Sequence, residues 1–104
     1  MDNTLSTITR DGRQNPLVIQ VTATSRSTAV AGKLVLLICE HTVAQVEAMD
    51  APAIYQAVKA LILAQQYLKD DHIELRCTPA FQAVVCDDQP VTAIRFLVEG
   101  RPLA

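Results

Sequence analysis

The 104-residue chain contains no tryptophan, and two tyrosines and two phenylalanines bring its aromatic content to only 4%. Its hydrophobic residues, 50% of the total, are therefore mostly Val, Ile, Leu and Ala, and these must build any core. A chain of this length is expected to form one domain with a real hydrophobic core. Charged residues amount to 19% with a formal net charge of -2, which argues against a strongly electropositive surface and against tight non-specific binding of nucleic acid.

Cysteine is scarce as well, and its three positions, Cys39, Cys77 and Cys86, form no recognisable pair. None belongs to a C-x-x-C motif or lies near a histidine at metal-ligand spacing, so the sequence predicts neither a zinc site nor a redox dithiol. Each lies in an apolar run, where a free cysteine behaves as a small buried hydrophobe. We therefore expect a reducing, cytoplasmic environment, with no metal and no cofactor.

The chain also lacks a long hydrophobic run and the pattern of a secretory signal. Its longest apolar run, residues 34–39, is far too short to span a bilayer, and residues 1–15 are mostly polar. We expect residues 1–15 to form a flexible arm and residues 16–104 to form one domain that does not associate with a membrane.

The first half of the domain shows a strand pattern followed by a helix pattern. A compact β-branched run predicts a strand over residues 17–22. Apolar residues at helical spacing predict a helix over residues 28–41, with Ser27 or Thr28 as its N-cap. Gly32 lies inside this helix at a cost of about 1 kcal/mol relative to alanine, and close packing against a neighbouring backbone would explain it.

The middle of the chain alternates and then becomes rich in alanine. Residues 43–49 predict a strand with a wetter face that carries Gln45 and Glu47. Asp50 is placed to cap a second helix, which continues to about Leu68. Because this helix is apolar around most of its circumference, a single sheet cannot cover all of it.

The last third contains extended segments. Residues 72–78 alternate, and Pro79 interrupts them, as expected at a bulge or an edge. The inward-facing residues of this segment are expected to be Ile73, Leu75 and Cys77. Residues 81–86 and 91–99 then predict a hairpin around residues 87–90. Right-handed crossovers place both helices on one side of a mixed sheet, so we predict an α/β fold of the α+β two-layer sandwich type, in the order β-α-β-α-β-β.

No arrangement of residues indicates catalysis. Ser25 and Ser27 have no histidine at a recognisable spacing, which gives nucleophilic catalysis little support. Asp87 and Asp88 are adjacent in a turn, which is more typical of turn chemistry than of acid–base catalysis. The two histidines lie beside the ends of predicted elements and have no metal-ligating partner nearby in the sequence. We therefore predict that the protein is not an enzyme.

Five short stretches carry a resemblance to a known family. They are Val21-Thr-Ala-Thr-Ser25, Val30-Ala-Gly32, Gln56-Ala-Val-Lys-Ala60, Pro79-Ala-Phe81, and Thr92-Ala-Ile94 followed by Val98-Glu99. In these stretches the chain resembles the stage V sporulation protein S family, whose members have an Alba-like β-α-β-α-β-β fold. The resemblance implies a non-enzymatic protein of sporulation or related developmental regulation in bacteria, and the wider Alba-like group implies dimers that bind nucleic acid.

The resemblance implies nucleic-acid contacts at three places, which correspond here to Ser25-Arg26-Ser27, Asp50-Ala51-Pro52 and Asp87-Asp88. Only the first place offers a cation, and the carboxylates of the other two would repel a phosphate backbone. The expected nucleic-acid-binding residues are Ser25, Arg26, Ser27, Lys33 and Lys59. Two alternatives remain open: Arg26 is either a phosphate ligand or an ordinary solvated cap residue, and Lys59 either flanks the site or only extends along its helix.

The second predicted helix carries the expected dimer interface. Small side chains allow two helices to approach closely, and a two-fold contact is self-complementary. The interface residues are expected to be Ile54, Tyr55, Val58 and Ile62, unless the first helix and the N-terminal arm cover them. Together with this helix, the resemblance implies a regulator that is a homodimer or higher homo-oligomer and binds DNA or RNA weakly. The alternative is a module for self-assembly or for a protein partner that kept the fold and lost nucleic-acid binding.

Overall fold

The computed structural model describes residues 17–103, so the predicted arm over residues 1–15 lies outside the described part. The elements are β1 (Val18–Gln20), α1 (Ser27–His41), β2 (Val43–Ala48), α2 (Ala51–Lys69), β3 (Ile73–Cys86) and β4 (Gln89–Pro102). The predicted order of elements is therefore confirmed. Of the helices in this part of the chain, neither has the length and hydropathy that a transmembrane segment requires.

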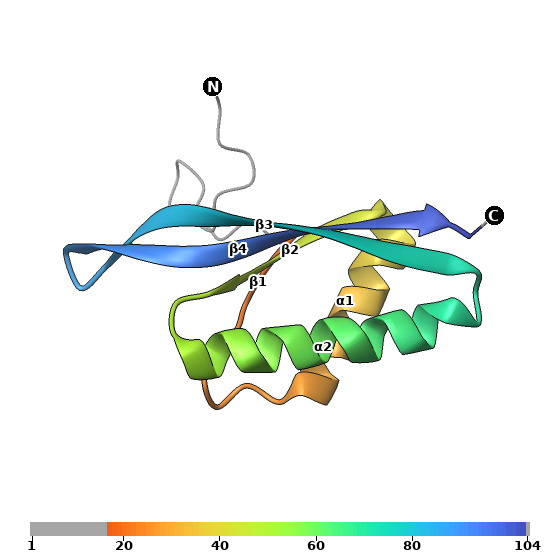
Figure 1. Cartoon of the computed structure of the whole chain (residues 1–104), viewed down its shortest axis with the longest axis horizontal. Helices are drawn as coiled ribbons and strands as arrows, with labels where there is room; N and C mark the ends of the chain where they lie inside the picture. Colours follow the sequence, from red (N-terminus) through yellow and green to blue (C-terminus); the bar gives the residue numbers. More distant parts are fainter. Residues whose placement is uncertain (1–16, 104) are drawn as a thin grey trace, which may run out of the picture.

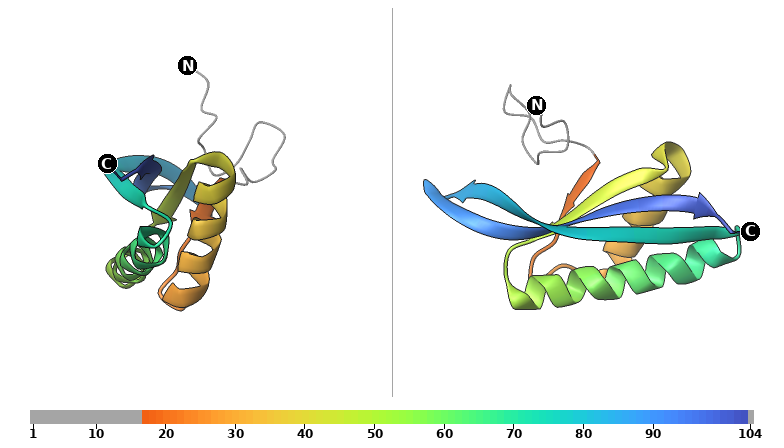
Figure 2. Two further views of the ribbon diagram at one scale, coloured as in Figure 1. Left: turned by 90° about the vertical axis from the view of Figure 1, so that its right-hand side faces the viewer. Right: turned by 45° about the horizontal axis from the view of Figure 1, so that its top comes forward.

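The described strands form one mixed sheet in the order β1-β2-β4-β3. β1 runs parallel to β2, whereas β4 is antiparallel to both of its neighbours. α1 and α2 lie on the same face of the sheet, which gives the predicted two-layer α+β sandwich (Figures 1 and 2).

The core lies between the helices and the sheet, and α2 contributes to it a face made of alanine. Along this face Ala53, Ala57, Ala60 and Ala64 are each at most 2% exposed, and Leu68 completes it. α1 adds branched aliphatic residues that include Leu34, which is fully buried. Because alanine is small, α2 can lie close to the sheet and to α1, and its larger apolar residues are left on its flanks and outer side.

The two helices begin differently. Asp50 caps α2 as predicted, because its Oδ1 accepts a hydrogen bond of 2.9 Å from the backbone N–H of Ala53. The predicted cap of α1 by Ser27 or Thr28 is wrong. Arg26 occupies the N-cap position there and makes no side-chain cap hydrogen bond.

β2 is buried on both faces, so the prediction of a wetter face is wrong. Gln45 is 2% exposed and Glu47 4% exposed, although both lie on the face of the sheet opposite the helices. Side chains of the two flanking strands contribute to this burial, because Gln20 on β1 and Arg95 on β4 lie against the Glu47 carboxylate on this face. The alternation of apolar and polar residues in the sequence does not show where in the sheet a strand lies.

β3 passes through Pro79 without interruption, contrary to the prediction, because β3 is an edge strand. The side-chain amide of Gln65 donates a bond of 3.0 Å to the Ile73 carbonyl and accepts one of 2.7 Å from the Leu75 N–H, so these groups point away from β4. Alternate residues of a strand share this direction, so Pro79 also faces outward, where no hydrogen bond of the sheet requires an N–H.

The predicted burial of the cysteines is also wrong. Cys39 and Cys77 are exposed, and Cys86 is half-buried. Cys77 lies opposite Val98 and therefore on the predicted, helix-facing side of the sheet, but at the edge strand this side is open to solvent.

Two glycines have opposite surroundings. A Cβ atom at Gly32 would meet no atom within 4 Å, so the close packing expected around this glycine is not found. A Cβ atom at Gly100 would lie 2.5 Å from Cγ2 of Ile38, so only glycine lets β4 lie this close to α1. Close packing therefore selects glycine at the end of the sheet and not inside the helix.

β3 and β4 form a hairpin that is longer than the rest of the sheet. The last residue of β2, Ala48, pairs with Ile94, which in turn pairs with Phe81. Residues 81–94, named here the hairpin arm, project past the start of α2 (Figure 1). The arm ends in a two-residue turn at Asp87 and Asp88, whose φ angles of 53° and 62° are those of a type I′ turn.

Candidate functional site

The start of α1 holds part of the predicted nucleic-acid site. Arg26 at the N-cap of α1 and Lys33 inside the helix are both exposed, and seven positions, about two helical turns, separate them. The first turn of α1 carries no acidic residue, and its N–H groups form the positive end of the helix dipole. This combination suits an anion such as a phosphate.

The serines on either side of Arg26 contribute less than expected. The hydroxyl of Ser25 accepts a hydrogen bond of 2.8 Å from the backbone N–H of Thr22 and so closes the loop before α1. Ser27 is the first residue of α1 and is half-buried. These positions shape the loop, and Arg26 remains its charged group.

Lys59 lies on α2 and not on α1, so the predicted set is divided between two helices. Its Nζ lies 4.6 Å from the centre of the Tyr55 ring, a cation–π distance. Lys59 therefore extends over a residue of the predicted dimer interface.

The other two contact places that the resemblance implies carry acidic groups, as the sequence predicts. The carboxylate of Asp50 already occupies the N-terminus of α2. Asp87 and Asp88 are exposed at the tip of the hairpin arm. Of the three places, only the start of α1 presents a cation.

The predicted dimer residues form a stripe on the outer side of α2. Tyr55, Val58 and Ile62, named here the apolar helix surface, are 63%, 39% and 54% exposed. Their i, i+3, i+7 spacing puts them on one face of the helix. Ile54 is half-buried and packs against the core, so it supports this face from the side. The sequence alternative of a cover by the first helix does not fit, because these three residues remain exposed with α1 in place.

Two large apolar residues of the hairpin arm were not predicted as surface residues from the sequence. Phe81 and Val85 are 78% and 77% exposed. They lie on the helix-facing side of β3, opposite Ile94 and Pro90. The signal was present in the alternation of Phe81, Ala83 and Val85, but a strand interrupted at Pro79 made this segment appear short.

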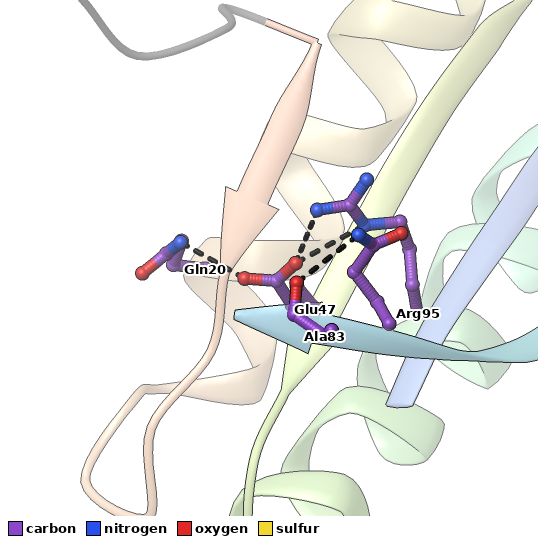
Figure 3. Close-up of polar contacts among 5 residues, drawn as sticks. Gln20, Glu47, Ala83 and Arg95 are labelled. Carbon is purple, nitrogen blue, oxygen red and sulfur yellow. Dashed lines mark hydrogen bonds and ion pairs between the residues drawn. The ribbon is translucent and has the colours of Figure 1, made fainter. Parts of the chain in front are cut away.

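A buried ion pair lies on the other face of the sheet (Figure 3). Arg95 on β4 donates from Nε to Oε2 of Glu47 at 3.1 Å and from Nη2 to the same oxygen. Gln20 on β1 donates to Oε1 of Glu47 at 3.1 Å. Glu47 was expected on the wetter face of its strand, but its side chain is 5% exposed and that of Arg95 is 8% exposed. The pair joins three strands, which is a structural role.

Gln45, on the same face of β2, is the remaining buried polar residue of this region. Its Oε1 is buried and, among the described residues, has no hydrogen-bond partner. A buried acceptor without a partner costs free energy, so Gln45 is a locally unfavourable position in β2.

Two further cations are held by carboxylates near the start of β3 and the end of β4. Arg76 lies 3.5 Å from Glu74, and Arg101 lies 3.8 Å from Glu99. The register also places Arg76 opposite Glu99 and Glu74 opposite Arg101. The four charges form an alternating, neutral arrangement that offers no net attraction to a phosphate backbone.

Residues 17–103 contain no group of three His, Cys, Asp or Glu side chains that could hold a metal ion. The Cys77 side chain has exposed area, yet partial desolvation raises the pKa of its thiol. Cys77 is therefore a protonated thiol at neutral pH, which is a weak nucleophile.

The chain matches a known family over most of its length. The family described as stage V sporulation protein S (SpoVS) matches residues 17–101. The match begins at the first described residue and includes β1, β2, β3, both helices and nearly all of β4. The chain therefore belongs to the stage V sporulation protein S family, and this membership supports a sporulation-related regulatory role.

Proposed function

We propose that this protein is a non-enzymatic sporulation regulator that acts as a homodimer in the cytoplasm, joined through the outer side of α2. The observation that carries the proposal is the apolar helix surface of Tyr55, Val58 and Ile62, which is exposed in the single chain. Contiguous apolar patches on soluble proteins mark interaction sites. Three free cysteines agree with a reducing compartment.

A two-fold axis beside α2 would bring this surface of each copy into the interface with the other copy. Every contact then occurs twice, so each apolar residue of the patch contributes twice to the stability of the dimer. Full burial of a large apolar side chain contributes about 1.5–3 kcal/mol to stability. Each of the three residues is already partly covered in the single chain, so each contributes less than this to the free energy of dimerisation.

The experiment is a measurement of mass in solution by sedimentation equilibrium over a range of protein concentrations. The wild type is expected to be a dimer, and Ile62→Glu a monomer. Leu36→Glu is the matched control, because Leu36 on α1 is 55% exposed, almost the same as Ile62. A monomeric wild type at high micromolar concentration would refute the proposal, as would a dimer that survives Ile62→Glu.

The start of α1 favours a second candidate function, weak binding of DNA or RNA. It rests on Arg26 at an N-cap position without a side-chain cap and on the exposed Lys33 about two turns further along α1. Fluorescence anisotropy with short labelled DNA and RNA duplexes tests it, from low to physiological salt. Phosphate contacts predict binding that weakens as salt rises and drops in Arg26→Ala, but not in the control Arg76→Ala. Absence of binding at low salt rules this function out.

A further inference from the structure

The hairpin arm has an apolar side that is open to solvent. The side chains of Phe81 and Val85 lie four positions apart on β3 and therefore on the same face. That face carries no charged residue between Cys77 and Val85. An isolated two-stranded ribbon is marginally stable in water, so cover over this side would stabilise the arm.

The arm cannot use its own α2 as that cover. β2 ends at Ala48, level with Ile94, and the chain then turns through Met49 and Asp50 into α2. From there α2 runs back beneath the sheet, while the arm projects in the other direction (Figures 1 and 2). The cover must come from outside the described chain.

The outer edge of β3 is poorly suited to an added strand, so a partner has to take the face instead. The amide of Gln65 already bonds the outward Ile73 carbonyl and the outward Leu75 N–H. Pro79 has no N–H to offer at the middle of the edge. Beyond it, the Gln82 side chain donates to the next backbone carbonyl at 3.2 Å. Such devices protect edge strands from pairing with another chain.

The charges of the arm and of α2 are opposite. α2 carries Lys59 and Lys69 and no carboxylate. The hairpin arm carries Asp87 and Asp88 and no cation. An arm and a helix from two copies would therefore attract each other, whereas two arms or two helices would not.

We propose that the hairpin arm of each copy lies across the outer side of α2 in the second copy of the dimer. This inference rests on the proposed function and names the second half of its interface. Phe81 and Val85 pack against the apolar helix surface of the other copy, and the two contacts are related by the two-fold axis.

The available area fits this assignment. The exposed parts of Phe81, Val85 and the apolar helix surface amount to roughly 600 Å², taking about 150–250 Å² for each large side chain. The helix surface alone provides about half of this. With the neighbouring backbone and small side chains, the arm and the helix together approach the ~800 Å² per partner that a specific interface buries.

A single indole tests the inference, because the chain has no tryptophan. In Phe81→Trp, the emission should be that of a solvent-exposed indole at low protein concentration and should shift to the blue as the dimer forms. The same substitution combined with Ile62→Glu should show no shift at any concentration. Leu36→Trp provides the matched control, with emission that is independent of concentration.

Removing the Phe81 ring measures how much the arm contact contributes to the affinity of the dimer. Phe81→Ser should raise the dimer dissociation constant at least about a hundredfold, since the ring is buried in both copies. A dimer whose indole at position 81 stays exposed, or whose affinity is unchanged in Phe81→Ser, overturns the arm contact and leaves the α2 dimer standing. A chain that remains monomeric in sedimentation overturns both.

Discussion

Removal of Arg95 should destabilise the protein strongly, because a buried carboxylate then loses two hydrogen bonds from a guanidinium group. Arg95 donates twice to Oε2 of Glu47, whose side chain is 5% exposed. Breaking a buried pair from one side costs about 3–5 kcal/mol. Small domains are stable by only about 5–15 kcal/mol, so Arg95→Met should remove a large part of the free energy of unfolding.

A double-mutant cycle separates the interaction free energy of the Glu47–Arg95 pair from the effect of changing each residue alone. Glu47→Leu combined with Arg95→Met replaces both charges by apolar groups and should cost much less than the sum of the single changes. The exposed arginine Arg101, 3.8 Å from Glu99, is the matched control, and Arg101→Met should change stability by less than about 1 kcal/mol.

Urea unfolding followed by circular dichroism measures these free energies, and thermal unfolding provides a second reading. For a domain of this size, Arg95→Met should lower the melting temperature by roughly 15–30 °C. If Arg95→Met costs less than about 1 kcal/mol, or if the single changes add up in the double variant, the ion pair does not hold the three strands together as argued.

Three further predictions concern the backbone, and urea unfolding tests each. Gly32→Ala should stabilise the protein by about 1 kcal/mol, because α1 has open space at this position; destabilisation would mean that the site is crowded. Gly100→Ala should destabilise it by about 1–3 kcal/mol, because the new methyl group collides with Ile38; an unchanged midpoint would contradict the packing. Thr42 has a φ of 65°, unfavourable for a β-branched residue, so Thr42→Gly should stabilise by about 1 kcal/mol, and a loss of stability would show that the threonine is not strained.

The sequence predicted some of the features that depend on local signals, although the predicted cap of α1 was wrong. The cap at Asp50 and the turn at Asp87-Asp88 follow from neighbouring residues alone. The burial of Glu47 and the continuity of β3 through Pro79 do not, because both depend on where a strand lies in the sheet. A strand flanked on both sides can bury a charge beside its partner, and an edge strand can contain a proline.

For the candidate surfaces as well, some features could be predicted from the local sequence and others depend on the arrangement of the strands. The outer side of α2 could be predicted, because more apolar residues surround this helix than one sheet can cover. The arm residues Phe81 and Val85 could not, because their exposure depends on β3 and β4 extending beyond β2. The pairing register decides how far one strand extends beyond its neighbour, and no single segment of the sequence contains this information.

The alanine face of α2 fixes the position of the helix in the fold, whereas the residues on its outer side are available for binding. Methyl groups at Ala53, Ala57, Ala60 and Ala64 fix the distance between α2 and the layer above it. A larger side chain at any of these alanines would push the helix outward. A substitution at Tyr55 or Ile62 would leave the packing of α2 against the sheet unchanged. During evolution, relatives can therefore exchange one assembly partner for another by changes on the outer side alone, without having to evolve a new core.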